Sequence, residues 1–506
     1  MPSKYWSVTA LKVVSLSAAS MACAAPQVSV PARAVHIGAD DSAGTSPADR
    51  DGLGPIRQGR LANGLRYAIL PRESAEPGFA IYMRVAGGFI AEKRPGERGL
   101  VHLIEHMAFK GSSHLEPGAM QRIGQPLTFP APSAASTNWQ NSSYYLSARG
   151  GDRRSMGTLL MLFREVASGL TFPEKGVEEA RAEVIAEMAD KRAGNKMFAS
   201  YIAAVAPGSP NDVIDAQNSD DVPTASTATL KQLYQRLYRP DQTTVILVGA
   251  VDPSVAETLI RQHFASWKAA GASPASLSAP TYSKAAIRPV SYSADPAGRS
   301  VVTVGVTMDL PSRARTGELR LRDRIMDLAS AQAASARLRS GQTSAPPGKV
   351  GATIENAEGY RLVRTWDFAD PDQWKPALVQ LRGQVCELHR SGWTQAEWEE
   401  AKKSTLAELR SKADGVRSEK HMNLAAELAD AGADAAGMTS SRELAAYAAG
   451  WLPGVDVRQA NARWRRQWDS GAEHTRVETP KLAGSPEALA DVTATVVGAG
   501  GLKCGR

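Results

Sequence analysis

The chain has 506 residues, of which 43% are hydrophobic and 22% are charged. This composition excludes a disordered protein, and the length exceeds what one hydrophobic core usually serves, so we expect two or more domains. The formal net charge is only +7, without a long basic run, which excludes the electrostatic pattern of a nucleic-acid-binding protein.

The N-terminus has the organisation of a secretory signal peptide. Two lysines precede or adjoin an uncharged run at residues 13–22, which leads into Ala-Cys-Ala, an A-x-A cleavage site. We therefore predict a signal peptide at residues 1–24 and an exported, periplasmic protein. No later apolar stretch is long enough to predict a transmembrane helix. Cys23 could instead be a lipidated first residue, and Cys386 and Cys504 could pair in an oxidising compartment.

Regular structure is predicted after a flexible leader at residues 25–54, which is rich in Ala, Ser, Asp, Gly and Pro. The Asn63-Gly64 dipeptide between two short apolar segments predicts a β-hairpin. Residues 79–92 follow as a strand with a glycine break. The next segment, which contains residues 102–111, is predicted to be a helix.

The following segments alternate between the periodicities of strands and helices. Residues 135–150 predict a strand, 156–170 and 173–193 predict helices, and 243–252 predicts a buried strand that leads into a further helix.

A stretch at residues 270–289, rich in Pro, Ser and Ala, predicts a linker. A second block of strands and long helices follows it. The mixed order predicts an α+β fold with two domains of similar size, at residues 55–269 and 290–506.

The sequence HLIEHMAFKG, residues 102–111, contains the strongest chemical motif. On a helix, His102, Glu105 and His106 project from the same side. Two neutral imidazoles at this spacing can bind one Zn²⁺, and the carboxylate then lies beside the open position where water binds. The order H-x-x-E-H is a metallopeptidase signature. The alternative is the polar side of an amphipathic helix, since apolar residues line the opposite side.

A catalytic zinc ion usually has three protein ligands, and the remaining histidines show no paired spacing. In the helix predicted over 173–193, Glu187 and Glu183 flank the apolar side. A carboxylate there is costly unless it is paired or binds a metal. Helix geometry favours these two glutamates as the third ligand without separating them, and Glu183 could instead orient a ligand from outside the coordination sphere.

The sequence ERGLVHLIEHMAFKGSSHL closely resembles the zinc-site helix of the pitrilysin/insulinase family of metallopeptidases, which includes the mitochondrial processing peptidase and many exported bacterial enzymes. RLANGLRYAIL, VAGGFIAEKRPGERG and LYRPDQTTVILVGAVD are similar to other segments of the family's first domain. GLTFPEKGVEEARAEVIAEMADK is similar to the segment that carries the third ligand, and this similarity makes Glu187 the ligand. The specific resemblance extends from residue 55 to about residue 270.

The resemblance implies a zinc-dependent endopeptidase that hydrolyses peptides or small unfolded proteins, with one Zn²⁺ per chain. His102, His106 and Glu187 would bind the metal, Glu105 would be the general base, and Glu183 would orient a ligand. The implied fold is half of a clamshell. It consists of two related domains, each a mostly antiparallel sheet packed with helices, and the second domain lacks zinc.

The segment STNWQNSSYYL, which begins at Ser136, resembles the edge strand on which family members pair their substrate. The implied substrate contacts are Ser136, Thr137, Asn138 and Asn141, with the peptide added as an extra strand. Asn141 and the residue before it stand where relatives usually carry a charged or histidine pair. An ordinary edge strand kept soluble by its amide side chains is the alternative.

Family members usually supply an arginine and a tyrosine, seven residues apart, to hold the substrate carbonyl. Neither Tyr360 nor Tyr447 has an arginine seven residues before it. We therefore expect a homodimer or a separately encoded partner half. Two other functions remain open: a non-catalytic subunit of a related peptidase, and a module that binds zinc or peptide without hydrolysis.

Overall fold

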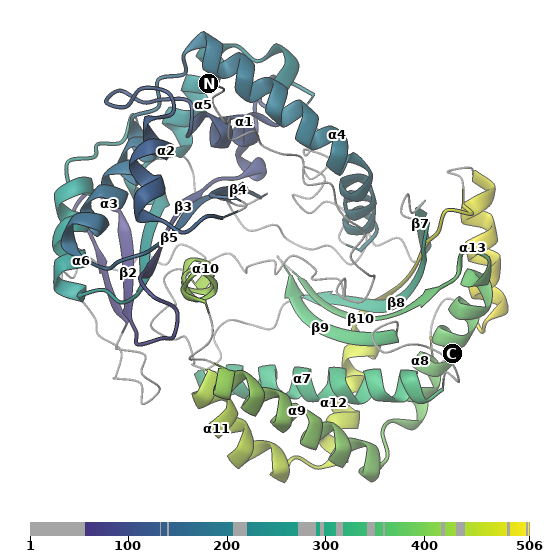
Figure 1. Ribbon diagram of the computed structural model, residues 1–506. Coiled ribbons are helices and arrows are strands. Elements are labelled where there is room, and N and C mark those ends of the chain that lie inside the picture. The colour runs from purple at the N-terminus through teal and green to yellow at the C-terminus, as the bar shows by residue number, and fades with distance from the viewer. Residues whose placement is uncertain are drawn as a thin grey trace, which may run out of the picture.

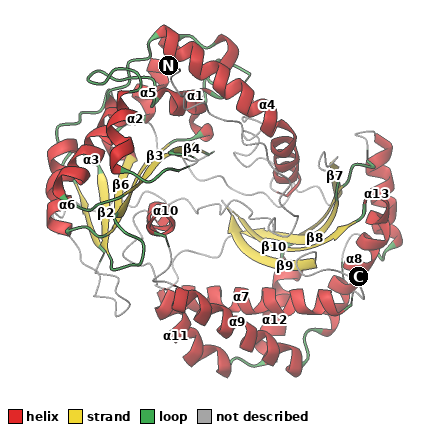
Figure 2. Ribbon diagram, in the orientation of Figure 1, coloured by secondary structure: helices red, strands yellow, loops and turns green. Residues whose placement is uncertain are grey.

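The computed structural model describes residues 56–131, 133–138, 141–205, 220–271, 290–293, 298–309, 317–341, 350–357, 360–415, 420–431, 441–482, 486–501 and 504. These residues form two sheets, each packed with helices (Figures 1 and 2). A separate hydrophobic core lies between each sheet and its helices. The prediction of an α+β fold with two domains is therefore confirmed.

Several predictions concern residues outside the described ones. They are the signal peptide at 1–24 with Cys23, the leader at 25–54, and all but the first two residues of the linker at 270–289. The domain limits at 55–269 and 290–506 accordingly stay predictions. In the part of the chain that the structure describes, no helix combines the length and the apolar character needed to cross a membrane.

The first sheet has six strands in the order β1-β2-β6-β3-β5-β4. Neighbouring strands are antiparallel except β2 and β6, which run parallel. The predicted hairpin is present as β1 and β2, and Gly64 in its turn has a φ of 96°, a left-handed conformation that favours glycine. The strand bounds are β1 Arg57–Arg60, β2 Arg66–Pro71, β3 Phe79–Ala86, β4 Ala135–Thr137, β5 Asn141–Ala148 and β6 Thr243–Gly249.

The segment 135–150, predicted as a single strand, forms the two strands β4 and β5. The physical reason is a turn at Asn138, whose side-chain oxygen accepts a hydrogen bond of 2.9 Å from the backbone N–H of Asn141. The chain reverses there, and β4 pairs antiparallel with β5. As a result β4, with Ser136 and Thr137, is the edge strand of the sheet.

Helices of the first domain cover one face of this sheet. Two of them begin at aspartate caps: the side chain of Asp152 accepts backbone N–H groups at the start of α3, and Asp252 does so for α6. The helix predicted over 173–193 is longer than expected and continues to Val205. The helices are α1 Leu100–Met107, α2 Ala119–Gly124, α3 Arg153–Ser168, α4 Glu174–Val205, α5 Thr227–Leu237 and α6 Pro253–Phe264, with short 3₁₀ turns at Phe89–Ala91, Gln125–Leu127, Val222–Thr224 and Pro240–Gln242.

The second sheet has five strands in the order β7-β11-β8-β10-β9, with only β7 and β11 parallel. Its core contains the fully buried indole rings of Trp398 and Trp464. The strands are β7 Val290–Ser293, β8 Ser300–Asp309, β9 Val350–Ala357, β10 Tyr360–Ala369 and β11 Ala472–Glu478. The helices are α7 Gly317–Ser340, α8 Trp374–Ser391, α9 Gln395–Gly415, α11 Ser441–Trp451, α12 Val457–Ser470 and α13 Pro486–Gly498, with 3₁₀ turns at Pro371–Gln373 and Leu452–Gly454.

The two domains exchange helices. Helix α10, His421–Ala431, comes from the second half of the chain but packs on the first sheet, where Leu424 and Leu428 are buried against Ala68 and Ile246 (Figure 1). In the other direction, α4 of the first domain reaches β7 and β11 of the second sheet. The first sheet therefore has its own helices on one face and α10 on the opposite face, while α4 contacts the second sheet at β7 and β11.

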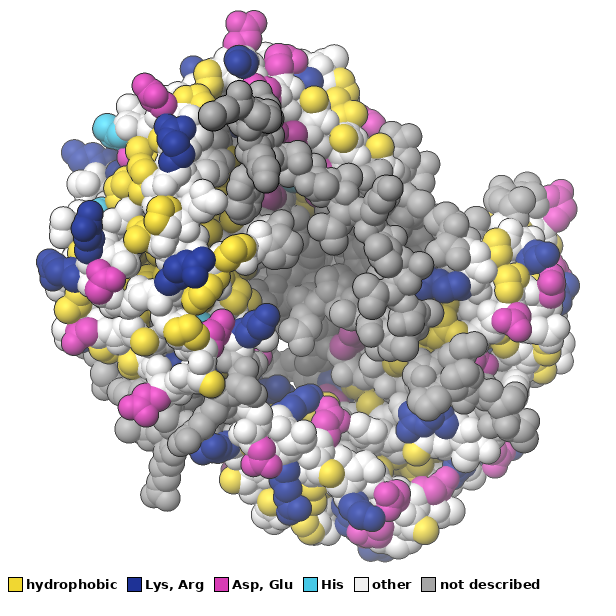
Figure 3. All heavy atoms as spheres, in the orientation of Figure 1, with side chains coloured by type: hydrophobic (Ala, Val, Ile, Leu, Met, Phe, Trp, Pro, Cys, Tyr) yellow, Lys and Arg dark blue, Asp and Glu magenta, His cyan; other side chains and the backbone are white. Residues whose placement is uncertain are grey.

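The outer surface carries charges of both signs. On the side of the molecule seen in Figure 3, the described Lys, Arg, Asp and Glu side chains are interspersed over both halves. This distribution agrees with the small net charge relative to the chain length.

A disulfide joins Cys386 of α8 to Cys504 near the end of the chain, with their Cα atoms 4.8 Å apart. The structure therefore contains the pairing that the sequence left open. Because 118 residues separate the two cysteines, the crosslink closes a long loop in the unfolded chain.

Replacing Cys386 and Cys504 together by serine is expected to destabilise the second domain by about 2–4 kcal/mol, since the unfolded chain gains the entropy of the open loop. Urea denaturation followed by tryptophan fluorescence measures this loss. Reduced wild-type protein should unfold at the same urea concentration as the double variant. Equal unfolding midpoints for the variant and the oxidised wild type would contradict the pairing.

Candidate metal centre

Helix α1 is fixed in place by a carboxylate from the preceding loop. Its N-cap residue, Gly99, is left-handed with a φ of 83° and offers no side chain. Glu92 replaces that cap, because its two carboxylate oxygens accept hydrogen bonds from the backbone N–H groups of Gly99 and Val101 at 2.9 and 2.8 Å. Leu103 and Ile104 on the opposite side are completely buried in the first core. These contacts fix the orientation of α1, and with it the direction in which His102, Glu105 and His106 project.

The structure brings His102, His106 and Glu187 together, and one ligand atom from each lies within 4.8 Å of the others. Glu187 Oε2 is 3.7 Å from His102 Nε2 and 3.4 Å from His106 Nε2. Donors that share one tetrahedral Zn²⁺ at about 2.1 Å are separated by about 3.4 Å. The donor types and the two distances to Glu187 therefore fit a single zinc ion.

Glu105 lies beside these three residues in a buried position. Its Oε2 atom has no hydrogen-bond partner among the described residues, and the side chain is almost completely shielded from solvent. Burial raises the pKa of Glu105, while His102, the Thr137 hydroxyl and His106 act in the opposite direction. A buried carboxylate oxygen without a partner is costly, and a metal-held water molecule next to it would satisfy it.

Glu183 contacts His106 from the side away from Glu187. Its Oε2 atom lies 3.1 Å from His106 Nδ1, and its Oε1 atom accepts a hydrogen bond of 2.7 Å from Lys110 Nζ. The hydrogen bond to His106 and the charge of Lys110 lower the pKa of Glu183. A carboxylate at Nδ1 favours the tautomer whose Nε2 is a free electron-pair donor. Glu183 is thus placed to orient His106.

His106 itself is held between two carboxylates. Burial lowers its pKa, but the hydrogen bonds to Glu183 and Glu187 outweigh burial and raise the pKa to about 9. Sequence reasoning missed Lys110, whose ammonium group donates a hydrogen bond to Glu183, the residue that contacts His106. The signal available in the sequence was its position four residues after His106, a spacing that places side chains on the same side of a helix, although α1 itself ends at Met107.

The four candidate substrate residues have different environments. Ser136 and Thr137 lie on the edge strand β4, Ser136 is exposed, and Asn138 is exposed at the turn after it. Asn141 is instead buried in β5, where its amide contacts the hydroxyl of Ser143 at 2.8 Å. The structure therefore groups the first three along one edge and places Asn141 inside the sheet.

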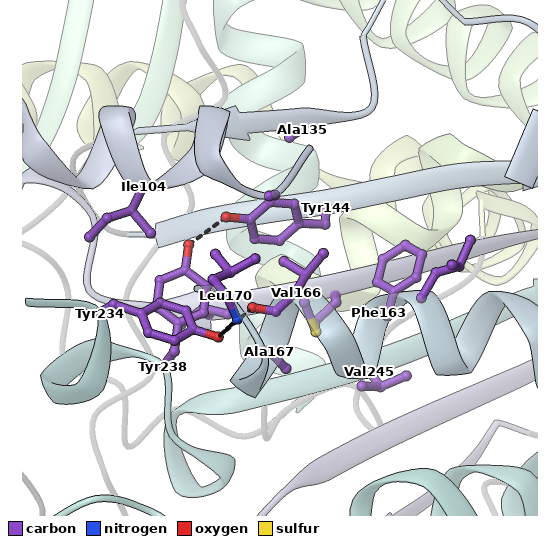
Figure 4. Close-up of a cluster of buried hydrophobic side chains, with 14 of the residues drawn as sticks. Ile104, Ala135, Tyr144, Phe163, Val166, Ala167, Leu170, Tyr234, Tyr238 and Val245 are labelled. Carbon is purple, nitrogen blue, oxygen red and sulfur yellow. Dashed lines mark hydrogen bonds between the residues drawn. The ribbon is translucent and has the colours of Figure 1, made fainter. Parts of the chain in front are cut away.

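Three buried tyrosines lie beneath the motif helix, and sequence reasoning did not identify them. In Figure 4, Tyr144 of β5 and Tyr238 point toward one another below Ile104 of α1, and their hydroxyl groups are 2.5 Å apart. Tyr234 donates a hydrogen bond of 2.8 Å to the carbonyl of Val166. Burial raises the pKa of each of these phenols, so they remain neutral.

Two family models match the chain. The insulinase (peptidase family M16) model matches residues 69–202, and the model for the peptidase M16 inactive domain matches residues 224–405. The chain therefore contains domains of the peptidase M16 (insulinase) family at residues 69–202 and 224–405. The resemblance found in the sequence is confirmed, and the insulinase match contains His102, His106 and Glu187.

One protein is similar to this chain in sequence, and two solved structures are similar to it in fold. "Probable zinc protease PqqL" of Haemophilus influenzae is 29% identical over 219 residues, which cover 41% of this chain and 23% of that protein. The crystal structure of the periplasmic protease PqqL from Escherichia coli has a TM-score of 0.74 and 19% identity, over 89% of this chain and 50% of that one. The crystal structure of the first half of the same protease has a TM-score of 0.72 and 19% identity, and the match covers 89% of this chain and 97% of that one.

These matches show that the chain has the fold of one clamshell half. It spans about half the length of the E. coli protease to which it is similar. The predicted clamshell-half architecture is thereby confirmed.

Replacing Glu183 by glutamine is expected to weaken Zn²⁺ binding about 10-fold or more, because His106 loses the charged partner that fixes its tautomer. Competition with a zinc-binding dye measures the affinity. Glu179→Gln is the matched control: Glu179 lies one turn earlier on α4, contacts Lys110 at 3.5 Å, and is half exposed. If both variants bind zinc as tightly as the wild type, Glu183 does not orient a ligand.

Proposed function

We propose that the chain is a zinc-dependent endopeptidase that hydrolyses peptides or small unfolded proteins. The observation that carries this proposal is the meeting of His102, His106 and Glu187 within 4.8 Å, beside the buried carboxylate of Glu105. Three protein ligands and an adjacent base are the composition of a hydrolytic zinc site. The description of the PqqL relatives as zinc proteases supports the same function.

The residues of the proposed centre have separate roles in metal binding, proton transfer and orientation of a ligand. His102, His106 and Glu187 would hold one Zn²⁺, which when bound polarises the scissile carbonyl and makes water more acidic. Glu105 accepts a proton from the attacking water and donates it to the leaving amine. The Thr137 hydroxyl, which lowers the pKa of Glu105, helps to keep that carboxyl in its basic form. Glu183 keeps the Nε2 atom of His106 directed at the metal.

The substrate would bind as an additional strand next to β4. This strand ends the sheet, so its outer edge has backbone groups available for pairing. Ser136, Thr137 and Asn138 line that edge, whereas Asn141 would act indirectly through the turn that it forms with Asn138. Backbone pairing places a peptide beside Glu105, since Thr137 is adjacent to both.

We further propose that the protein is exported to the periplasm and works with a second half. Residues 1–24 have the pattern of a signal peptide, the related PqqL structure is described as periplasmic, and a disulfide suits an oxidising compartment. Because the chain spans about half of that protease, a homodimer or a separately encoded half would complete the clamshell. Anchoring through a lipid on Cys23 is the alternative for the N-terminus.

A non-catalytic subunit or a binding module is the second candidate function. The observation in its favour is the match of residues 224–405 to a domain described as inactive. All four residues of the proposed centre lie outside that range, within the insulinase match at 69–202. The enzyme is therefore the function that the site supports best.

Cleavage of an unstructured peptide by purified protein tests the proposal. Glu105→Gln is expected to reduce the cleavage rate by about 10²–10⁴-fold while zinc remains bound, because only proton transfer is lost. Removing the metal with a chelator should abolish cleavage, and added Zn²⁺ should restore it. Wild-type protein that binds zinc without cleaving would support the binding module, and protein that binds no zinc would support the non-catalytic subunit.

A further inference from the structure

A row of arginines crosses the first sheet. The Cα register aligns Arg60 of β1 with Arg66 of β2, Arg66 with Thr244, and Thr244 with Arg84 of β3. The same line continues from Arg84 to Ser143 and from there to Ser136 on the edge strand. We call Arg60, Arg66 and Arg84 the arginine row.

The arginine row lies on the face of the sheet on which α10 packs. Tyr67 and Met83, which are sequence neighbours of Arg66 and Arg84, belong to the core under the domain's own helices. Side chains alternate along a strand, so the arginines point to the opposite face. Helix α10 covers another part of that face, and Arg60 and Arg66 remain exposed.

The charges of the row are close enough to repel one another. Although the Arg66 side chain reaches the surface, partial desolvation by the surrounding protein and the charges of Arg60 and Arg84 lower the pKa of Arg66, whereas Asp241 raises it. Asp241 also forms an ion pair of 3.1 Å with Arg239, so it is shared between cations. Like charges directly opposite in a sheet reduce stability. An anionic ligand on this face would remove that repulsion.

An aromatic pair borders the row. Tyr82 and Tyr145 occupy the next register position on the same face, and their rings stack with centroids 5.7 Å apart and an angle of 17° between planes. Both side chains are partly exposed. Arginines beside aromatic rings form a surface that suits a polypeptide carrying carboxylates, since guanidinium groups bind carboxylates in a bidentate manner.

The row is connected to the proposed catalytic centre through β4. The line of register partners continues from Arg84 through Ser143 to Ser136, and the hydroxyl of the next residue, Thr137, lowers the pKa of Glu105. With neighbouring strands about 4.8 Å apart, a peptide paired outside β4 lies about 14 Å from Arg84 and about 24 Å from Arg66. An extended chain covers those distances in about four to seven residues, and it reaches Arg60, one strand further away on β1, in about nine.

We propose that the arginine row binds acidic side chains of the polypeptide substrate, so that the protein selects substrates with an Asp- or Glu-rich segment about four to nine residues from the cleaved bond. This inference rests on the proposed function for the position of the cleaved bond. The binding of an acidic segment to this face can be measured without cleavage.

Fluorescence anisotropy with the full-length Glu105→Gln protein tests the proposal. Two labelled peptides share one central sequence, and one has a tail of glutamates where the other has glutamines. At low ionic strength the acidic peptide is expected to bind about 10-fold more tightly, and added salt should reduce the difference. The double variant Arg60→Gln, Arg66→Gln should lose most of the preference, and Arg60→Lys, Arg66→Lys, which keeps the charges without the guanidinium groups, should retain part of it.

The matched control is Arg153→Gln, Arg154→Gln, which removes two exposed charges from α3 on the other side of the sheet. It should bind both peptides as the parent protein does, and no variant should melt at a lower temperature than the parent protein. Equal binding of the two peptides, or an acidic preference that survives in the Arg60→Gln, Arg66→Gln variant, overturns the inference. All proteins in this binding experiment carry Glu105→Gln, so the experiment does not measure cleavage. Wild-type protein that fails to cleave in a separate assay would count against the proposed function alone.

Discussion

The arrangement of the site depends on close packing between α1 and the first turns of α4. The two histidines are on α1 and the third candidate ligand is on α4, so their distance is set by the contact between the two helices. Gly176 permits that contact, because a Cβ atom there would lie only 3.1 Å from the Cβ atom of Lys110. Glu92 fixes the opposite end of α1 through two backbone N–H groups. Displacement of either helix would separate the three donor atoms.

The second domain takes part in this arrangement without supplying a candidate ligand. Helix α4 carries Glu187 near its middle and continues to β7 and β11 of the second sheet. In return α10 packs on the first sheet, and its first residue, His421, has Nε2 3.0 Å from the carbonyl oxygen of Glu76. The exchange couples the two cores, so the position of Glu187 relative to α1 is supported from both domains. A first domain isolated from the second would lose part of that support.

Local sequence patterns were sufficient to predict the histidine pair, because the spacing of His102, Glu105 and His106 places their side chains on the same side of a helix. They were insufficient to choose between Glu183 and Glu187, which are one helical turn apart. The fold separates them, because Glu187 meets both Nε2 atoms and Glu183 meets the Nδ1 atom of His106. The β4–β5 hairpin has a side-chain and a backbone hydrogen bond between Asn138 and Asn141, which the periodicity of the segment does not reveal. The amphipathic pattern of α10 does not specify which sheet the helix covers, so long-range packing decides its position.

The central claim is that two imidazoles from α1 and one carboxylate from α4 bind the same zinc ion. X-ray absorption spectroscopy at the zinc edge of the metal-loaded protein examines this coordination directly. The account predicts two nitrogen ligands with imidazole scattering and oxygen ligands at about 2.0–2.1 Å, with the carboxylate contribution lost in Glu187→Ala and retained in Glu183→Ala. A spectrum with one imidazole or with sulfur ligands, or one that Glu187→Ala leaves unchanged, would contradict it.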